Sequence, residues 1–451
     1  MHRIARRKKP PSPVRVITVG FSLLIVLGTL LLCLPFATRS GQSAGPVTAL
    51  FTATSATCVT GLVVEDTYLF WSPFGQAVIL LLIQVGGLGF MMAAAGFSFV
   101  IRRRITLRER LLLGQSLSVE EMSGIVRLAR GILVGTFAIE AMGAVILAIR
   151  FARDFGLRGG IVKGIWTSVS AFCNAGFDLM GETGAFSSMA KYLGDPAVTL
   201  TISLLIILGG LGFYVWSDLV TCPKNRRYRL HTSLVLATTG ILLLAGTLGF
   251  LAFEWNNPQT LGDKSVFDRI MAAVFHSSSV RTAGFDQMGQ AGLTSASRAL
   301  TILLMFIGGS PGSTAGGIKT TTLAVLVLTA VAPYRGRNQA SAFGRTIAQK
   351  SVTDALSVLV TGLFLVICSS FLVSWADKLP FETAVYECVS GFATVGLSLG
   401  VTPTLSVFSK LVLVLLMFTG RVGVMTIGAA ALFRSSGEGR IKEPEGRVMV
   451  G

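Results

Sequence analysis

Charged residues are scarce in this sequence. Only 14% of its 451 residues are Asp, Glu, Lys or Arg, whereas about 25% is usual for soluble domains. With 52% apolar residues, the chain cannot give two or three soluble domains a charged surface, so an integral membrane protein is expected. Histidine is rarer still, at His2, His231 and His276. No His-Glu-x-x-His, Gly-x-Ser-x-Gly or paired-Asp arrangement occurs, which argues against an enzyme.

The sequence also lacks the patterns that mark a metal site or a nucleotide-binding fold. Its six cysteines show no CxxC spacing, and most lie in or beside apolar segments, so they are expected to be unpaired packing residues. Two Gly-Gly-Leu-Gly-Phe segments lack the third Gly of a dinucleotide fingerprint. Any regulation by a nucleotide is therefore expected to come from a partner protein.

Acidic residues are outnumbered by basic ones. The chain has 39 Lys and Arg against 22 Asp and Glu, a net charge of +17. Most of the cations fall into five clusters, at 3–15, 102–110, 224–229, 335–350 and 434–447. In an eight-span topology all five lie on one side of the cell membrane, which the positive-inside rule makes the cytoplasm, with both termini there. This charge is expected to orient the chain and contact membrane lipid, and no nucleic acid partner is expected.

Eight apolar runs are long enough to cross a bilayer, which needs about 20 residues. They occupy 16–36, 74–101, 131–149, 196–217, 232–253, 299–334, 355–376 and 411–433. Between them lie half-apolar stretches too short to span, near 46–57, 162–173, 266–280 and 381–393. Such stretches, followed by Gly, are expected to be re-entrant helices that enter the membrane and turn back.

Two sequence features recur four times in the same order. Each half-apolar stretch ends in a small-residue turn, and a Ser stands six residues before the Gly of that turn. The Gly residues are Gly61, Gly176, Gly284 and Gly396. A second Gly-rich element follows in the next apolar run, beginning at Gly86, Gly209, Gly308 and Gly420. The chain is therefore interpreted as four repeats of helix, re-entrant helix and helix, over 16–110, 111–230, 231–350 and 351–434, between a basic N-terminus (1–15) and a tail (435–451).

The four turns are expected to form a cation site. A re-entrant helix that ends inside the membrane directs the negative end of its dipole at the midplane. The residues that follow can supply rings of backbone carbonyls that replace the water shell of a dehydrated ion. The side chains two positions before each Gly differ chemically, which favours carbonyls as the ligands. The residues of these turns, called the Gly turns below, are Val59, Thr60, Gly61, Asn174, Ala175, Gly176, Thr282, Ala283, Gly284, Thr394, Val395 and Gly396.

These motifs resemble those of the Trk/Ktr/HKT superfamily of potassium transporters. The likeness covers about 16–433 and is greatest to the KtrB-type membrane subunit. It implies an all-α integral membrane fold, with eight transmembrane and four re-entrant helices as M1–P–M2 repeats around a pseudo-fourfold, potassium-channel-like pore. It also implies that the Gly turns form the selectivity filter. In the family a Ser in the first repeat accompanies sodium permeation, so Gly61 favours potassium.

The third repeat departs from the others in its second element. Residues 308–319, called the repeat-3 loop below, contain too many Gly, and Pro311, for a continuous helix, since Gly costs ~1 kcal/mol and Pro about 3. Non-helical backbone at membrane depth lines a cavity or is buried in protein. The segment is one residue off a phosphate-binding P-loop, which needs Gly directly before Lys, and that interpretation is rejected. The resemblance implies a gate beneath the filter, made of Gly308, Gly309, Ser310, Gly312, Ser313, Thr314, Gly316, Gly317 and Lys319, with Arg421 as an electrostatic barrier.

Several charged residues fall inside or next to apolar segments. Arg421 is expected to face the ion pathway, the alternative being that it extends to the cytoplasmic surface. Glu140 and Arg281 are costly if unpaired, and one hypothesis is that they pair behind the filter; ion coordination by Glu140 is the alternative. Asp178 and Asp286 either attract cations at the outer mouth or are ordinary loop acids.

The sequence thus predicts a potassium-translocating membrane subunit, with potassium as the transported ion and sodium coupling left open. The alternative is the potassium-translocating subunit of an ATP-driven pump. The resemblance implies a homodimer on a cytosolic ring of KtrA-type, nucleotide-binding regulatory subunits, for which 102–110 and 335–350 are candidate docking loops. An intramembrane enzyme lacks any motif here, and a scaffold gives no reason for four polar turns in a membrane.

Overall fold

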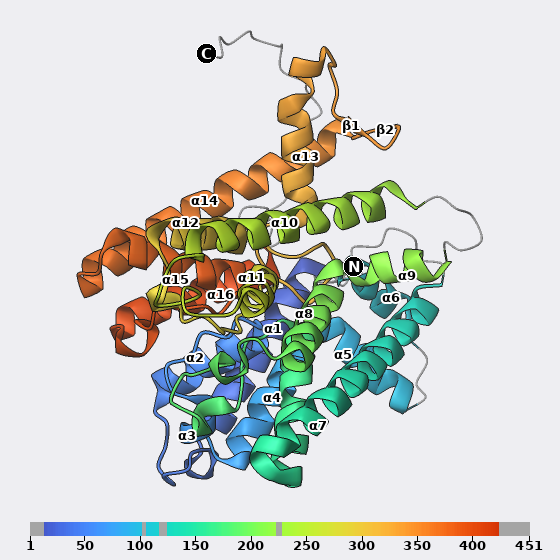
Figure 1. The fold of residues 1–451 in the computed structure, drawn as a ribbon. Coiled ribbons are helices and arrows are strands. Elements are labelled where there is room, and N and C mark those ends of the chain that lie inside the picture. The colour runs from blue at the N-terminus through green and yellow to red at the C-terminus, as the bar shows by residue number, and fades with distance from the viewer. Residues whose placement is uncertain (1–12, 102–104, 117–123, 222–227, 424–451) are drawn as a thin grey trace, which may run out of the picture.

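The computed structural model describes residues 13–101, 105–116, 124–221 and 228–423, and its regular structure is almost all helical. The α-helices are α1 (Pro13–Leu32), α2 (Pro46–Thr57), α3 (Thr67–Phe70), α4 (Pro73–Leu88), α5 (Phe90–Val100), α6 (Leu107–Ser116), α7 (Ile125–Cys173), α8 (Pro196–Leu211), α9 (Phe213–Thr221), α10 (Leu230–Glu254), α11 (Val266–Ser279), α12 (Ser295–Phe306), α13 (Thr320–Val331), α14 (Gln349–Asp377), α15 (Phe381–Ala393) and α16 (Val407–Val422). Short 3-10 helices are η1 (Pro35–Ala37), η2 (Met180–Glu182), η3 (Ala190–Tyr192), η5 (Gln290–Gly292), η6 (Pro333–Arg335) and η7 (Thr402–Thr404). The strands β1 (Ser341–Ala342) and β2 (Arg345–Thr346) pair antiparallel, and they lie with α13 at a projection from the rest of the fold (Figure 1).

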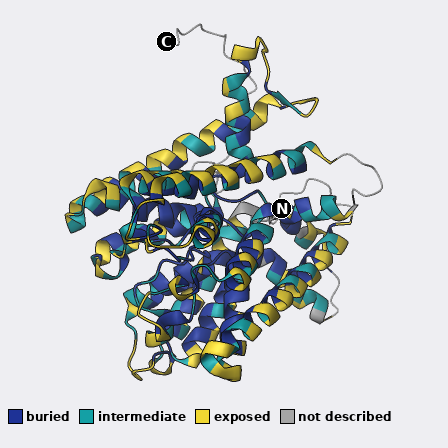
Figure 2. Cartoon of the chain, viewed as in Figure 1, coloured by how far each residue is buried: buried dark blue, intermediate teal, exposed yellow. Residues whose placement is uncertain are grey.

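Long apolar helices surround the structure. Among the described residues, α1, α7, α10 and α14 are long and apolar enough to cross a membrane, and up to six spans result if two bent helix pairs each count as one. These helices expose large apolar side chains, for example Phe364 and Trp375 on α14, the latter 80% exposed. Figure 2 shows exposed positions along the outer helices and buried ones gathered in the interior. Apolar surface of this extent fits contact with lipid.

Two of the expected spans are broken. The runs 74–101 and 196–217 are not single straight helices: α4 and α5 meet at 101°, and α8 and α9 at 94°. The breaks fall at Gly89 (φ 84°) and Gly212 (φ 93°), whose backbone conformations lie outside the helical region. A residue with a Cβ is strained at such φ, so Gly in this element sets where the chain turns.

The third repeat is interrupted where its composition predicts. Helix α12 ends at Phe306 and α13 begins at Thr320, and the repeat-3 loop between them is not helical. In the second repeat, the expected re-entrant stretch 162–173 is the last part of α7, which bends at Gly156 (φ 70°). The short helices α2, α11 and α15 occupy the other three expected re-entrant stretches.

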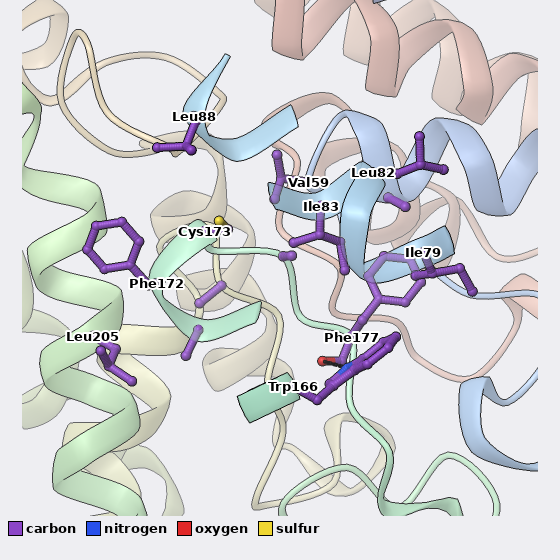
Figure 3. Close-up of a cluster of buried hydrophobic side chains, with 14 of the residues drawn as sticks. Val59, Ile79, Leu82, Ile83, Leu88, Trp166, Phe172, Cys173, Phe177 and Leu205 are labelled. Atoms are coloured by element: carbon purple, nitrogen blue, oxygen red, sulfur yellow. Dashed lines mark hydrogen bonds between the residues drawn. The ribbon is translucent and has the colours of Figure 1, made fainter. Parts of the chain in front are cut away.

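The interior is made of apolar side chains from different repeats. In one cluster Ile79 and Ile83 of α4 pack with Phe172 and Cys173 of α7 (Figure 3). A second cluster joins α10, α15 and α16. The five described cysteines are free, as predicted. The basic clusters 3–15, 224–229 and 434–447 lie largely or wholly outside the described residues, as do residues 102–104 of the cluster 102–110.

Candidate functional site

Four helices end at the same buried region of the structure. They are α2 at Thr57, α7 at Cys173, α11 at Ser279 and α15 at Ala393, and all four end residues are fully buried. Each is followed by one Gly turn. Because the last carbonyls of a helix carry the negative end of its dipole, these four ends create a region that favours a cation.

The four Gly turns form a closed ring. A Cβ placed on Gly61 would lie 2.5 Å from the carbonyl oxygen of Ala175, and one on Gly176 would lie 2.7 Å from that of Ala283. In the same way, Gly284 lies against the carbonyl of Val395, and Gly396 against that of Thr60, which returns to the first turn. The structure therefore brings the four Gly turns together in a ring, in which the carbonyl oxygen of the residue before each glycine lies beside the glycine of a neighbouring turn.

The backbone of each turn contains two left-handed residues separated by one. The glycines have φ between 69° and 94°, and the residues two positions earlier, Val59, Asn174, Thr282 and Thr394, have φ of 57°, 57°, 83° and 53°. A left-handed conformation is rare for β-branched residues and costs of order 1–3 kcal/mol. Three of the four early residues, Val59, Thr282 and Thr394, are β-branched, so the recurrence of this geometry in separate segments indicates that the surrounding fold imposes it.

The Ser six residues before each glycine supports the ring in two repeats only. The amide N–H of Gly61 donates to Ser55 Oγ, and that of Gly396 donates to Ser390 Oγ, each at 3.1 Å. In the second repeat Ser170 Oγ has no partner among the described residues. In the third, Ser278 Oγ donates back to its own helix, and Ser279 Oγ donates to the carbonyl of Phe285. The four turns are thus similar in backbone but not in their supports.

The second Gly-rich element packs against the ends of the re-entrant helices, a contact that the sequence did not predict. A Cβ on Gly86 would overlap the carbonyl oxygen of Thr57, four residues before Gly61. Gly209 and Gly420 stand in the same relation to Phe172 and Phe392. Close approach of two backbones requires Gly at these positions, because any side chain would displace the helix end that carries the Gly turn.

The repeat-3 loop lies against three of the Gly turns. Asn174 Nδ2 donates to Thr314 Oγ1 at 2.8 Å, and that hydroxyl donates to the carbonyl of Phe172 at 3.1 Å. A Cβ on Gly316 would overlap the Thr394 hydroxyl, and one on Gly308 would lie 3.2 Å from the Thr282 methyl. The loop is therefore packed directly beside the residues that begin the Gly turns.

The loop is held by its own backbone and by the second repeat. Its two ends pair, since the amide of Gly308 donates to the carbonyl of Ile318 at 2.8 Å. Further bonds run from Ser310 N to Gly210 O, Thr314 N to Gly209 O, Phe213 N to Gly312 O, Thr320 N to Gly309 O and Ser313 Oγ to Ser310 O. Gly312 and Gly317 both have φ of 66°. Although the repeat-3 loop is not helical, its backbone groups thus form hydrogen bonds within the loop and with the second repeat.

Two cations point at this loop. Arg421 of α16 donates to the carbonyl of Thr314 and to those of Gly86 and Gly87, the last at 3.0 Å. Lys319 Nζ donates to the carbonyls of Ala315 (2.7 Å) and Gly316 (3.2 Å). The guanidinium therefore joins the fourth repeat, the first repeat and the loop through backbone oxygens, and it is half-buried.

The hypothesis that Glu140 pairs with Arg281 is wrong. Both Glu140 carboxylate oxygens accept from Gln84 Nε2 at 3.2 Å, and Cys173 Sγ lies 3.9 Å from one of them. Among the described residues Glu140 forms no salt bridge, and the Nε of Arg281 has no hydrogen-bond partner. Glu140 faces α4 rather than the third repeat, which sequence distance cannot reveal.

Acids lie just outside the ring. Asp286 accepts from the amides of Met288, Gly289 and Gln290 and so orders its own loop. Asp178 accepts from the amide of Met180 at 2.8 Å. Burial, helped by a nearby second acid, raises the pKa of Asp178 to about 6.

Comparison with known proteins identifies the family. A family profile described as "TrkH: Cation transport protein" matches residues 11–436. The chain is 41% identical to the Potassium/sodium uptake protein NtpJ of Enterococcus hirae, covering 99% of both proteins. It is 38% identical to the Ktr system potassium uptake protein B of Bacillus subtilis, over 98% of this chain and 97% of that one. The crystal structure of the potassium transporter TrkH from Vibrio parahaemolyticus matches with a TM-score of 0.72 at 18% identity, covering 95% of this chain and 86% of that one. The chain therefore belongs to the TrkH family of cation transport proteins.

Proposed function

We propose that this chain takes up potassium across the cell membrane through a channel-like path on the axis of the four Gly turns. As a member of its family it is a transporter and not an enzyme. The carbonyls of the Gly turns would form the selectivity filter by replacing the hydration shell of the ion. Relatives named for potassium uptake, and one for potassium and sodium uptake, support this substrate.

The closed ring of the four Gly turns carries the proposal. Four helix C-termini supply negative potential, and four segments with two left-handed residues each bring carbonyls to one axis. A structural role alone gives no reason for repeated backbone strain of this kind. Sodium fits as a coupled or secondary ion, and the carbonyl chemistry serves either cation.

The repeat-3 loop is proposed to gate this path. It packs against the beginnings of three Gly turns, and Arg421 and Lys319 add two positive charges there. A cation beside a cation pathway raises the barrier for ions to pass. Opening would require the loop to leave Asn174 and Thr314 to leave Arg421.

The wider assembly is part of the same proposal. The chain would form four M1–P–M2 repeats with eight transmembrane helices, both termini in the cytoplasm, and two copies per transporter. The Ktr system names of its relatives support a cytosolic, nucleotide-binding partner of KtrA type. The loop 335–350, which includes the projecting β1–β2 hairpin, is a candidate docking site for that partner (Figure 1).

Complementation tests the proposal. Expression of the chain should restore growth of a potassium-uptake-deficient cell at low external potassium. Gly61→Ser and Gly284→Ser, tested alongside at equal expression, should weaken potassium selectivity, because each side chain would enter the ring. Failure of the wild-type chain to rescue, despite membrane insertion, would contradict potassium uptake.

Flux into liposomes separates this function from that of a pump subunit. Purified protein in potassium-gradient liposomes should conduct without ATP or any partner ATPase. Strict dependence of flux on ATP and an added ATPase subunit would support the pump instead.

A further inference from the structure

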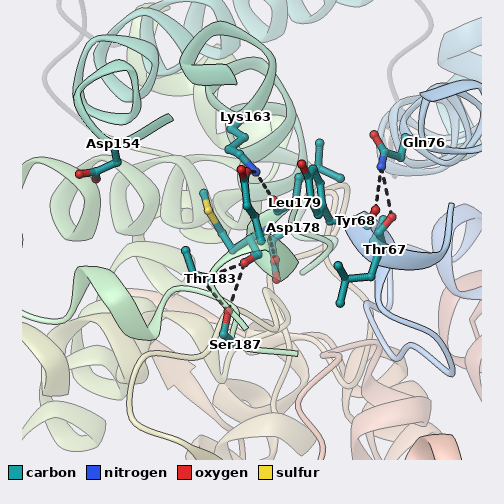
Figure 4. Close-up of polar contacts among 12 residues, drawn as sticks. Thr67, Tyr68, Gln76, Asp154, Lys163, Asp178, Leu179, Thr183 and Ser187 are labelled. Carbon is teal, nitrogen blue, oxygen red and sulfur yellow. Dashed lines mark hydrogen bonds and ion pairs between the residues drawn. The ribbon is translucent and has the colours of Figure 1, made fainter. Parts of the chain in front are cut away.

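One face of the second re-entrant helix holds residues 177–179, which leave the ring after Gly176 and are called the outgoing segment below. Trp166 Nε1 donates to the carbonyl of Phe177 at 3.1 Å (Figure 3). Lys163, one turn earlier in α7, donates through Nζ to the carbonyl of Leu179 at 2.5 Å (Figure 4). The two acceptors are alternate residues directly after Gly176. One helix face therefore holds two carbonyls of the segment that follows Gly176.

The Lys163 ammonium is enclosed on all sides by specific partners. Only 4% of the residue is exposed. Besides Leu179, it lies 3.3 Å from a Glu182 carboxylate oxygen, 4.3 Å from the Tyr68 ring centroid and 4.5 Å from that of Phe155. One carbonyl, one acid and two aromatic faces compensate its charge. A lysine held this tightly has little rotamer freedom and fixes its acceptor in place.

The residues at the equivalent positions of the other repeats do not donate such bonds to the segment that follows their Gly turn. The residues matching Trp166 in distance from the ring glycine are Phe51, Val274 and Tyr386, and those matching Lys163 are Thr48, Met271 and Thr383. Phe51 and Val274 have no side-chain donor, and Tyr386 donates to Gln290 of another loop. The second repeat also lacks the Ser-to-Gly bond, since Ser170 Oγ has no partner among the described residues. Lys163 and Trp166 thus support the second repeat after its glycine, whereas the first and fourth repeats have a serine bond to the glycine amide and the third has the Ser279 bond to the carbonyl of Phe285.

We propose that Lys163 and Trp166 are positioning residues that set the ion selectivity of the second Gly turn. The inference rests on the proposed filter function. By fixing the carbonyls of Phe177 and Leu179, the two side chains limit how far Gly176 can move toward a smaller ion. Selectivity by a ring of carbonyls depends on keeping the oxygens at the spacing that suits the larger ion. If the outgoing segment can move, the ring can contract around sodium and selectivity falls.

Substitutions of Lys163 and Trp166 distinguish an effect of charge on selectivity from an effect of positioning. Lys163 also lies near Asp178, so removing its side chain changes the electrostatic potential at the outer mouth and also removes the bond to the outgoing segment. Trp166 carries no charge, and Trp166→Phe removes only its N–H donor while keeping an aromatic ring. A shared effect of both substitutions on selectivity therefore reports positioning, whereas an effect of Lys163 alone reports charge.

The test is sodium and potassium flux through purified full-length variants in liposomes without a partner. Trp166→Phe should raise the sodium-to-potassium flux ratio roughly two- to tenfold, the fold change that one neutral hydrogen bond supplies. Lys163→Met should raise it by at least as much, and Lys163→Arg should restore part of the selectivity. Lys191→Met removes an exposed lysine on the same outer side, 3.7 Å from Asp154, and should leave the ratio unchanged.

The outcomes separate this inference from the proposed function. Wild-type flux and selectivity are measured in the same liposomes, and absent wild-type flux refutes the transport function itself. A selective wild type with an unchanged ratio in Trp166→Phe overturns the positioning role, whatever Lys163→Met does. Melting temperatures of the detergent-solubilised variants exclude a general loss of fold, which would lower all fluxes without changing their ratio.

Discussion

Removing the Arg421 side chain should release the repeat-3 loop. The guanidinium donates to the carbonyl of Thr314 in the loop and to those of Gly86 and Gly87 in α4, so it links the loop to α4. Arg421→Ala removes these bonds and one of the two positive charges beside the loop. We expect faster potassium flux through the variant.

The size of the effect follows from the single bond that reaches the loop. A hydrogen bond with a charged donor contributes about 1.5–3 kcal/mol. Since 1.4 kcal/mol is a tenfold change in an equilibrium, the ratio of open to closed loop should rise roughly 10- to 150-fold. Lower repulsion of the permeating ion would add to the flux. Arg421→Lys keeps the charge but cannot make the forked set of bonds, so its flux should be intermediate.

The effect is measured as tracer potassium flux into potassium-loaded liposomes that contain equal amounts of wild-type or variant protein. Lys410→Ala is the control, because Lys410 also lies on α16 and donates to a carbonyl, that of Pro403, far from the loop. Thr314→Val offers a second route, since it breaks the hydroxyl bonds of the loop while leaving Arg421 in place. Wild-type flux in both Arg421→Ala and Thr314→Val would refute the idea that these contacts close the path.

Three further predictions concern the ring and its surroundings. Ser55→Ala should lower potassium-over-sodium selectivity, because it leaves the buried Gly61 amide unpaired at a cost of about 1–3 kcal/mol. Ser278→Ala should not, because the Ser278 hydroxyl bonds within its own helix. Equal selectivity of the two variants would contradict this prediction. Gly420→Ala should lower the Tm by several degrees and reduce flux, because its Cβ would overlap the carbonyl at the end of α15, and an unchanged Tm would argue against that contact. Because the pKa of Asp178 is raised to about 6, its carboxylate is mostly ionised at external pH 7.5 and mostly neutral at pH 5. The potassium concentration for half-maximal uptake should therefore rise as pH falls. Asp178→Asn should remove this pH dependence, and a pH dependence that persists in this variant would come from another group.

Local patterns predicted the elements well where composition alone decides them. The Gly and Pro content of 308–319 excludes a helix, and the structure has none there. The re-entrant stretches end where the small-residue turns begin, and a left-handed residue two positions before each Gly lies within three residues of the helix end. The same reasoning was available for Gly89 and Gly212, yet the apolar runs around them were long enough to suggest uninterrupted spans. Hydropathy reports length and polarity but not a bend of about a right angle.

Partners of buried polar groups were not predictable in the same way. Glu140 meets Gln84 instead of Arg281, and Lys163 and Trp166 bind carbonyls beyond the Gly turn, because a hydrogen bond formed by tertiary folding leaves no local sequence pattern. A lone Lys in a half-apolar stretch was the available signal for Lys163. A buried lysine needs acceptors, but the sequence does not say which carbonyls supply them.

The amino-acid sequence by itself indicated a membrane protein and located four recurring turns, each centred on one Gly. Those properties follow from composition and from the backbone preferences of Gly, which act over a few residues. Only the tertiary structure decided that the four turns close into a ring, that Gly86, Gly209 and Gly420 touch the helix ends, and that Arg421 contacts the loop of another repeat. Such contacts depend on packing between distant segments, where a difference of one ångström separates a bond from a clash.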